Sequence, residues 1–281
     1  MGTSGFERYA GQVAVITGGA SGIGRALAVR AVELGMKVVI ADVEIGPLRS
    51  TANDLGVEAF HVDVCDPVGV EALAKFVDEQ FGSCDLLFNN AGVAGRGRID
   101  EQTLNDWNWI IDVNVRGVVH VIHAFLPRMQ SSERGGHIVN TASIGGLTAI
   151  VSGPYTATKY AVVGISETLR HELAGSSVGV SVLCPGFVRT NLATSDRNRP
   201  PESVPTKSGT RTSGFGLLAG TKPLILDPQQ VAEQVFVSVA RNDFWIVTDP
   251  SILSAVSRYD ELRAIAEVGG TAHPVTTLGD A

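Results

Sequence analysis

The chain has 281 residues, of which 44% are hydrophobic and 18% are charged. This composition excludes a disordered chain, because disordered chains combine low hydrophobicity with a high net charge. The formal net charge of −7, with no run of five or six like charges, argues against nucleic acid or an anionic membrane as the main partner.

Targeting and metal-binding patterns are missing from the sequence. No stretch reaches 18 uninterrupted apolar residues, and the N-terminal residues lack the basic-then-apolar pattern of a signal peptide. Cys65, Cys84 and Cys184 are widely spaced, which indicates reduced thiols. His120 and His123 have no carboxylate or thiol partner in register. We therefore expect a cytoplasmic protein with no membrane contact and no metal site.

Short β-branched runs alternate with longer segments of helical periodicity along the first 190 residues. The predicted strands are residues 12–17, 37–41, 58–62, 86–89, 137–141, 178–183 and 245–248. The predicted helices include residues 24–34, 67–81, 104–129, 155–173 and 228–241. Because the strand segments are almost entirely apolar, they predict a parallel sheet with both faces covered. The predicted fold class is α/β, with about seven strands in a single doubly wound domain.

The last third of the chain interrupts this alternation. Residues 194–213 are rich in Pro, Ser, Thr and Arg, and the apolar residues 215–219 follow them. We interpret residues 191–227 as an insertion that forms a lid over a substrate, because a loop of this length is usually functional or disordered. The catalytic domain is expected to span residues 1–267 and to end in a helix at 252–267. Residues 268–281 are expected to form a loose tail.

The first predicted strand leads directly into TGGASGIG at residues 17–24 and then into a helix. Glycines here let a strand turn sharply and let a pyrophosphate approach the N–H groups at a helix N-terminus. Asp42 ends the second predicted strand, where a carboxylate can accept both hydroxyls of an adenosine ribose. It would also repel a 2′-phosphate, and neither Ser21 nor Val43 offers a neutralising cation. These residues predict NAD rather than NADP as the cofactor.

In these motifs the sequence resembles the short-chain dehydrogenase/reductase family over residues 12–191, with further similarity to residue 248. The glycine spacing is that of the family's compact subgroup, and the resemblance implies a Rossmann-type sheet. Also similar to the family pattern are Asp63-Val64, which would contact adenine, and the NNAG sequence of residues 89–92, which would support the sheet and the cofactor. The NAD site that we predict consists of Gly18, Ser21, Gly22, Ile23, Gly24, Asp42, Asp63, Val64, Asn90, Ala91, Gly92, Tyr155, Lys159, Pro185, Gly186, Val188 and Thr190.

Tyr155 and Lys159 are four residues apart in a predicted helix, so both side chains lie on one face. A nearby ammonium favours phenolate and lowers the pKa of a tyrosine, which makes Tyr155 a usable proton shuttle. The resemblance implies that Ser143 hydrogen-bonds the substrate oxygen and that Lys159 also binds the nicotinamide ribose. It implies further that Asn114 kinks a long helix and holds a water that relays protons to the lysine. The predicted catalytic residues are Asn114, Ser143, Tyr155 and Lys159.

These residues predict an NAD-dependent oxidoreductase that transfers a hydride between a secondary alcohol, or a ketone in reverse, and the nicotinamide. Because the apolar part of the insertion would cover the pocket, we expect a mainly apolar substrate. Two alternatives stay open, an NADP-linked carbonyl reductase and a non-catalytic dinucleotide-binding sensor on the same fold. The resemblance also implies a homodimer or homotetramer.

Overall fold

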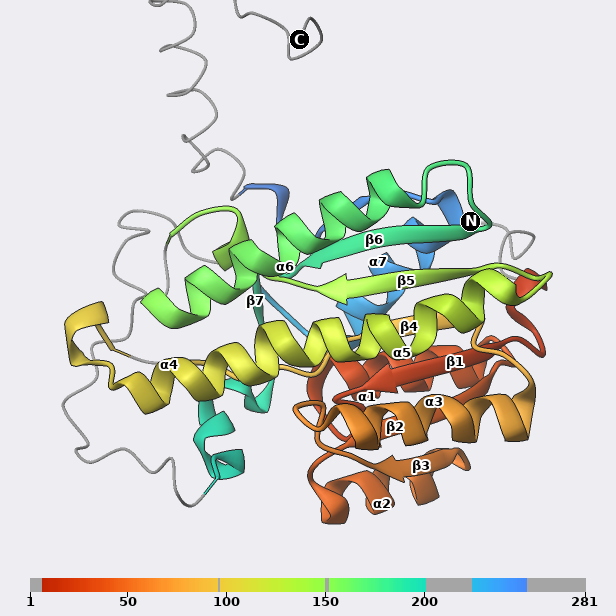
Figure 1. Ribbon diagram of the computed structural model, residues 1–281, viewed down its shortest axis with the longest axis horizontal. Helices are drawn as coiled ribbons and strands as arrows, with labels where there is room; N and C mark the ends of the chain where they lie inside the picture. The colour runs from red at the N-terminus through yellow and green to blue at the C-terminus, as the bar shows by residue number, and fades with distance from the viewer. Residues whose placement is uncertain (1–6, 96, 150–151, 201–223, 252–281) are drawn as a thin grey trace, which may run out of the picture.

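The computed structural model describes residues 7–95, 97–149, 152–200 and 224–251. Within these residues, seven strands form one parallel sheet in the spatial order β3-β2-β1-β4-β5-β6-β9 (Figure 1). The strands are β1 (Val13–Thr17), β2 (Lys37–Asp42), β3 (Glu58–His61), β4 (Leu86–Asn89), β5 (Gly136–Thr141), β6 (Val178–Cys184) and β9 (Trp245–Val247). The predicted doubly wound parallel sheet is therefore confirmed, with strand ends that differ from the prediction by at most one residue.

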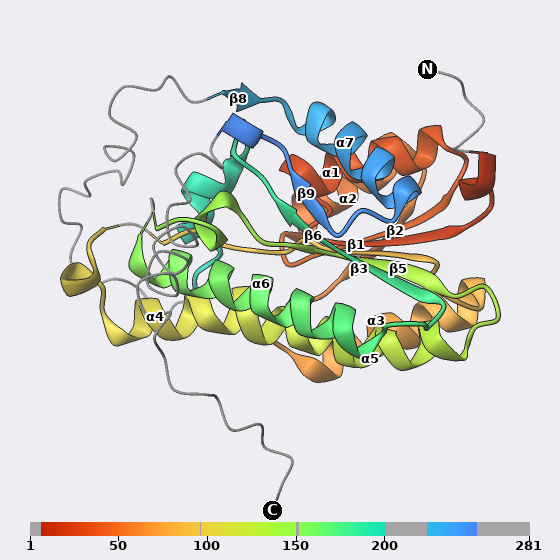
Figure 2. The same cartoon turned by 90° about the horizontal axis from the view of Figure 1, so that it is seen from above.

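Helices cover both faces of the sheet (Figure 2). One face carries α1 (Gly22–Glu33), α2 (Ile45–Leu55) and α7 (Pro228–Arg241), and the other carries α3 (Pro67–Phe81), α5 (Gly117–Ser131) and α6 (Gly153–Glu172). Along β1, Ala14 and Ile16 are buried in the apolar cluster of the first face, whereas Val13 and Val15 belong to the cluster of the other. Burial on both faces explains why the strands have apolar sequences without alternation.

Two local features differ from the sequence-based prediction. Helix α2 adds to the helices named from the sequence, and it contains Gly46 and Pro47 near its start because a proline is tolerated in the first turn of a helix. The single helix predicted at 104–129 is found as α4 (Leu104–Ile111) and α5, joined by the π-helical turn η4 (Asp112–Arg116). This turn contains Asn114.

The helical segment Leu104–Ser131 passes a length and composition test for crossing a membrane, with a hydropathy of 1.3 in its most apolar window. Half of that window is buried inside the structure. Figure 2 shows the segment lying along the sheet beside α6. A buried core helix passes the same test, so the segment is explained by its packing in this domain.

Shorter elements complete the described part of the chain. They are the 3₁₀ turns η2 (Glu7–Tyr9), η3 (Ile99–Glu101), η5 (Ile144–Gly146) and η6 (Asn191–Asn198), and the two-stranded pair β7 (Phe187–Val188) and β8 (Ile225–Leu226). The start of the predicted insertion is thus helical rather than irregular. The predicted apolar segment 215–219, the helix at 252–267 and the tail at 268–281 lie outside the described residues.

His137, near the start of β5, is a buried titratable group at the amino ends of the strands. Its Nε2 lies 2.7 Å from Ser181 Oγ on β6, and that hydroxyl donates to the carbonyl of Asp243 at 2.6 Å. Nε2 therefore carries the hydrogen and donates to Ser181. Burial, together with the positive charge of Arg8, lowers the pKa of His137 to about 4.

This shift makes stability depend on pH in a defined window. Below pH 6.5 the unfolded chain protonates this imidazole, whereas the native protein does so only near pH 4, so stability falls as the pH drops between these values. Between pH 7 and pH 4, the free energy of unfolding should fall by less in His137→Gln than in the unmodified protein, and the difference should be on the order of 3 kcal/mol. Denaturant unfolding at pH 7 and pH 4 measures the difference, and equal pH dependence in both proteins would contradict the assignment.

Candidate active site

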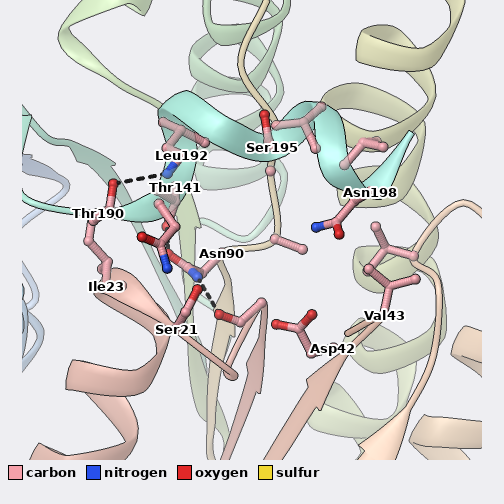
Figure 3. Close-up of a pocket in the computed structure, with 18 of the residues that line it drawn as sticks. Ser21, Ile23, Asp42, Val43, Asn90, Thr141, Thr190, Leu192, Ser195 and Asn198 are labelled. Atoms are coloured by element: carbon pink, nitrogen blue, oxygen red, sulfur yellow. Dashed lines mark hydrogen bonds between the residues drawn. The ribbon is translucent and has the colours of Figure 1, made fainter. Parts of the chain in front are cut away.

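A cavity of about 410 Å³ opens at the carboxyl ends of the parallel strands. Because the strand order changes direction between β1 and β4, the loops that follow these strands diverge and leave a crevice at this edge of the sheet. Figure 3 shows the cavity, with η6 lying across it. Every predicted site residue lines this cavity except Gly24 and Asn114, which pack directly behind its wall.

The turn between β1 and α1 forms the floor of the cavity. Gly18 and Gly22 adopt positive φ angles of 65° and 54°, which favour glycine. A Cβ on Gly18 would lie 2.9 Å from Ala91 Cα, and one on Gly24 would lie 2.0 Å from the carbonyl oxygen of Gly18. The side chain of Ser21 makes no capping bond to α1, so the first N–H groups of the helix face the cavity with no cap from this residue.

The wall beside this turn is held by hydrogen bonds between the ends of β1 and β4. Thr17 Oγ1 accepts from the backbone N–H groups of Asn90 and Ala91, at 2.9 and 3.1 Å. The Asn90 amide donates to the Thr17 carbonyl at 3.1 Å, and Gly92 follows on the same wall. These bonds leave little freedom for the turn to move away from β4.

Asp42 lies at one end of the cavity, where β2 stops. Its Oδ2 accepts from the Ala20 N–H at 3.1 Å and its Oδ1 from the Glu44 N–H at 3.0 Å. Burial raises the pKa of Asp42, and these backbone bonds oppose the rise. Each oxygen keeps a further lone pair for a ligand in the cavity. Asp63 and Val64 line the same end.

Ser143, Tyr155 and Lys159 meet at the opposite end of the cavity, where β5 stops and α6 begins. Tyr155 is only 8% exposed. Lys159 Nζ donates to the Thr141 carbonyl at 2.9 Å and lies 5.6 Å from the centroid of the Tyr155 ring. The i and i+4 spacing does bring the ammonium and the phenol ring onto one face, as predicted.

The electrostatics of this end differ from the sequence-based expectation. Burial raises the pKa of Tyr155, whereas we expected Lys159 to lower it; a hydrogen bond with Ser143 opposes the rise. Burial also lowers the pKa of Lys159 to about 8. Desolvation is the largest effect on both groups, because each is buried. The net shift of the Tyr155 pKa is therefore upward, and the lowering by Lys159 that we expected stays a prediction.

Asn114 is fully buried in the π-helical turn and its amide is held by protein groups. Oδ1 accepts from the Val93 N–H at 2.8 Å, and Nδ2 donates to the Val93 carbonyl at 2.9 Å and to Thr158 Oγ1 at 3.2 Å. A Cβ on Gly92 would lie 3.3 Å from Asn114 Oδ1 and 3.4 Å from Lys159 Nζ. Asn114 thus joins the loop after β4 to the catalytic helix.

The segment after β6 closes the cavity from the side. Pro185, Gly186, Val188 and Thr190 all line it, as predicted for the residues that hold a carboxamide. The Gly186 N–H donates to Thr248 Oγ1 at 3.0 Å, which ties this segment to the end of β9. Thr190 caps η6 through a 3.4 Å bond from the Leu192 N–H, drawn in Figure 3.

Sequence reasoning missed two groups of residues that line the cavity. The first is Glu44, Leu192, Ser195, Arg197, Asn198 and Pro200, and the second is Asn105, Asn108, Trp109, Asp112 and Val113 from α4 and η4. No short motif marks these positions. Glu44 lies two residues beyond Asp42, the rest of the first group reach the cavity through the path of η6, and the second group reach it from α4 and the π-helical turn. Among the described residues, no group of three or more His, Cys, Asp and Glu side chains is placed to hold a metal ion.

A crevice at the carboxyl edge of a doubly wound sheet, with a glycine turn, an acidic strand end and a Ser, Tyr and Lys cluster, is typical of dinucleotide-dependent oxidoreductases. Comparison with known families agrees, since the family model described as short chain dehydrogenase matches residues 12–201 of this chain. The chain belongs to the short-chain dehydrogenase/reductase family, whose members are oxidoreductases.

Individual relatives are similar over nearly the whole chain. C alpha-dehydrogenase of Sphingobium sp. (strain NBRC 103272 / SYK-6) is 34% identical over 90% of this chain and 86% of that protein. The CLA biosynthesis dehydrogenase/reductase of Lactiplantibacillus plantarum is 33% identical over 87% of this chain and 90% of that protein. A short chain dehydrogenase/reductase from Burkholderia phymatum, solved in complex with NAD, is 40% identical, with a TM-score of 0.84 over 97% of this chain and 99% of that one.

Replacing Asn114 with alanine tests its structural role. The substitution should lower the free energy of unfolding by about 2–4 kcal/mol, because the N–H and carbonyl of Val93 lose their buried partner and each such loss costs about 1–3 kcal/mol. Urea unfolding measures this. Asn108→Ala, an exposed position on the rim of the same cavity, is the control and should cost less than about 0.5 kcal/mol. Equal losses would contradict the assigned role.

Proposed function

We propose that this protein is an NAD-dependent dehydrogenase that interconverts a mainly apolar secondary alcohol and its ketone. The observation that carries the proposal is the meeting of Ser143, Tyr155 and Lys159 at one end of a cavity whose other end is Asp42. The glycine turn supports it, because Gly18 and Gly24 leave no room for a side chain where a pyrophosphate would approach α1. When bound, the nicotinamide supplies the site that accepts or returns the hydride.

Each catalytic side chain has a role that follows from its contacts. The Ser143 hydroxyl, hydrogen-bonded with the phenol of Tyr155, would also hold the substrate oxygen. Tyr155 would take the hydroxyl proton of the alcohol as the hydride leaves, and return it in the reverse direction. Lys159 would bind the nicotinamide ribose and favour the phenolate through its charge. Because burial opposes a phenolate, the hydrogen bond with Ser143 and the cation are both needed for Tyr155 to act as a base.

The cofactor residues would divide between the two ends of the cavity. Asp42 would accept the adenosine ribose hydroxyls, with Asp63 and Val64 beside adenine. At the nicotinamide end, the backbone and hydroxyl groups of Pro185, Gly186, Val188 and Thr190 would hold the carboxamide. The complex of the Burkholderia phymatum relative with NAD supports this choice of cofactor. The carboxylate of Asp42 supports NAD over NADP, because it would repel a 2′-phosphate.

The substrate proposal rests on the other residues of the cavity. Val93, Trp109, Val113 and Leu192 line it on the side of α4 and η6, among polar residues that include Asn105, Asn108 and Asp112, and these apolar side chains support the proposal of an apolar alcohol over a polyol. A purely binding function is disfavoured, since a sensor has no chemical use for a tyrosine beside a lysine. We also propose a cytoplasmic location and a homodimer or homotetramer, with no nucleic acid or membrane partner.

Replacing Tyr155 with phenylalanine tests the proton shuttle. The turnover number with NAD and an accepted secondary alcohol should fall roughly 10²- to 10⁴-fold, the usual contribution of general acid–base catalysis, while NADH binding stays nearly the same. Tyr160→Phe makes the same change on the same helix outside the cavity, and it should keep most of the activity. Near-normal turnover in Tyr155→Phe would remove Tyr155 from the mechanism.

Replacing Asp42 with alanine tests the cofactor choice. The ratio of NADPH to NADH dissociation constants, measured by fluorescence titration, should fall roughly tenfold, because a charged acceptor for the ribose and a repulsion of the phosphate are both lost. Asp54→Asn, an exposed acid outside the cavity, should leave the ratio unchanged. If the unmodified protein bound NADPH more tightly than NADH, the proposed cofactor would be wrong.

A further inference from the structure

An arginine that belongs to no recognised sequence motif lies at the Asp42 end of the cavity, although it is far from Asp42 in the sequence. Arg197, on η6, pairs with Glu44, two residues beyond Asp42. Its Nε and Nη2 donate to Glu44 Oε1 and Oε2, both at 2.7 Å, which is the bidentate geometry that guanidinium also forms with phosphate. Figure 3 shows the neighbouring Asn198 on η6 facing the end of β2 at Asp42 and Val43.

The other terminal nitrogen of Arg197, Nη1, is held by the arginine's own segment. Nη1 donates to the carbonyls of Asn191 and Thr194, at 3.2 and 2.9 Å, and also lies 3.1 Å from Thr194 Oγ1. The guanidinium is thus fixed in place. The edge formed by its Nε and Nη2 atoms is the one that Glu44 occupies. The hydrogen bonding and charge of Arg197, with a further hydrogen bond from Asn198, hold the pKa of Glu44 below its usual range.

The pair lies close to the position that decides between NAD and NADP. Asp42 is near enough for its charge to raise the pKa of Arg197, although Glu44 has the larger effect. A cation beside the ribose-binding carboxylate would favour a 2′-phosphate, unless another anion already holds it. Glu44 is that anion, and its side chain is only 18% exposed.

We propose that Glu44 is a second cofactor-specificity residue, which excludes NADP by occupying the fork of Arg197 and by adding its own charge to that of Asp42. The proposal rests on the proposed NAD-dependent function and deepens it. Specificity of this kind comes from a repulsive element set against the wrong ligand, and not only from contacts to the right one. A role limited to anchoring η6 predicts instead that loss of the pair weakens NADH and NADPH alike.

The experiment is a fluorescence titration of NADH and NADPH against the unmodified protein, Glu44→Gln, Arg197→Gln and the double variant. Glu44→Gln keeps the size of the side chain but removes its charge, and should lower the NADPH dissociation constant roughly tenfold while NADH changes little. The double variant should lose this gain, because the released cation is gone. Arg197→Gln alone should not weaken the binding of NADPH relative to the binding of NADH. Glu33→Gln, which breaks an exposed pair with Arg30 on α1, is the matched control.

The outcomes separate this inference from the proposed function. An unmodified protein that binds neither nucleotide, or prefers NADPH, overturns the NAD-dependent function and the inference with it. Preference for NADH with an unchanged ratio in Glu44→Gln overturns the inference alone, and so does an equal loss of both cofactors. If Arg197→Gln selectively weakens NADPH, the arginine already serves the phosphate, and the inference is again wrong. Circular dichroism confirms that each variant is folded, and Arg197→Gln remains decisive if Glu44→Gln does not fold.

Discussion

The site depends on how closely the chain approaches itself where β1 and β4 end. Gly18 lies against Ala91, and Gly24 lies against Gly18, at distances that no larger residue fits. Thr17 and Asn90 fasten the same contact with hydrogen bonds. Because every strand of the sheet is parallel, all their carboxyl ends face this one place. The N-terminus of α1 and the catalytic side chains therefore come together without any loop having to bridge a long distance.

Much of this arrangement could be predicted from the sequence, because its signals are local. Apolar runs such as those of β1 and β4 indicate strands buried on both faces, and the glycines before α1 indicate a tight turn. The spacing of Tyr155 and Lys159 places both on one face of a helix. The π-helical turn at Asn114 has no such local signal, because the apolar residues of 104–129 predict one continuous helix, and only the family resemblance implies a kink at Asn114.

What could not be predicted depends on burial and on contacts between distant segments. The sequence places an ammonium near Tyr155, but it does not reveal how deeply both groups are buried, and that burial sets the direction of both pKa shifts. Likewise, Arg197 meets Glu44 across 153 positions of the chain. Neither Ser21 nor Val43, which the motifs place beside Asp42, is a cation, and the cation that lies there comes from another part of the chain.

Two ion pairs that differ in their burial attach η6 and the residue after it to the rest of the domain. Arg199 pairs with Asp106 at 2.7 Å, with both side chains almost fully buried, and stacks over the Trp109 ring at 4.2 Å. The pair of Arg197 with Glu44, at the β2 side, is more exposed. Dissolved salt screens exposed charges far more than buried ones. Rising ionic strength should therefore weaken the attachment of η6 to the end of β2 before it weakens the attachment to α4.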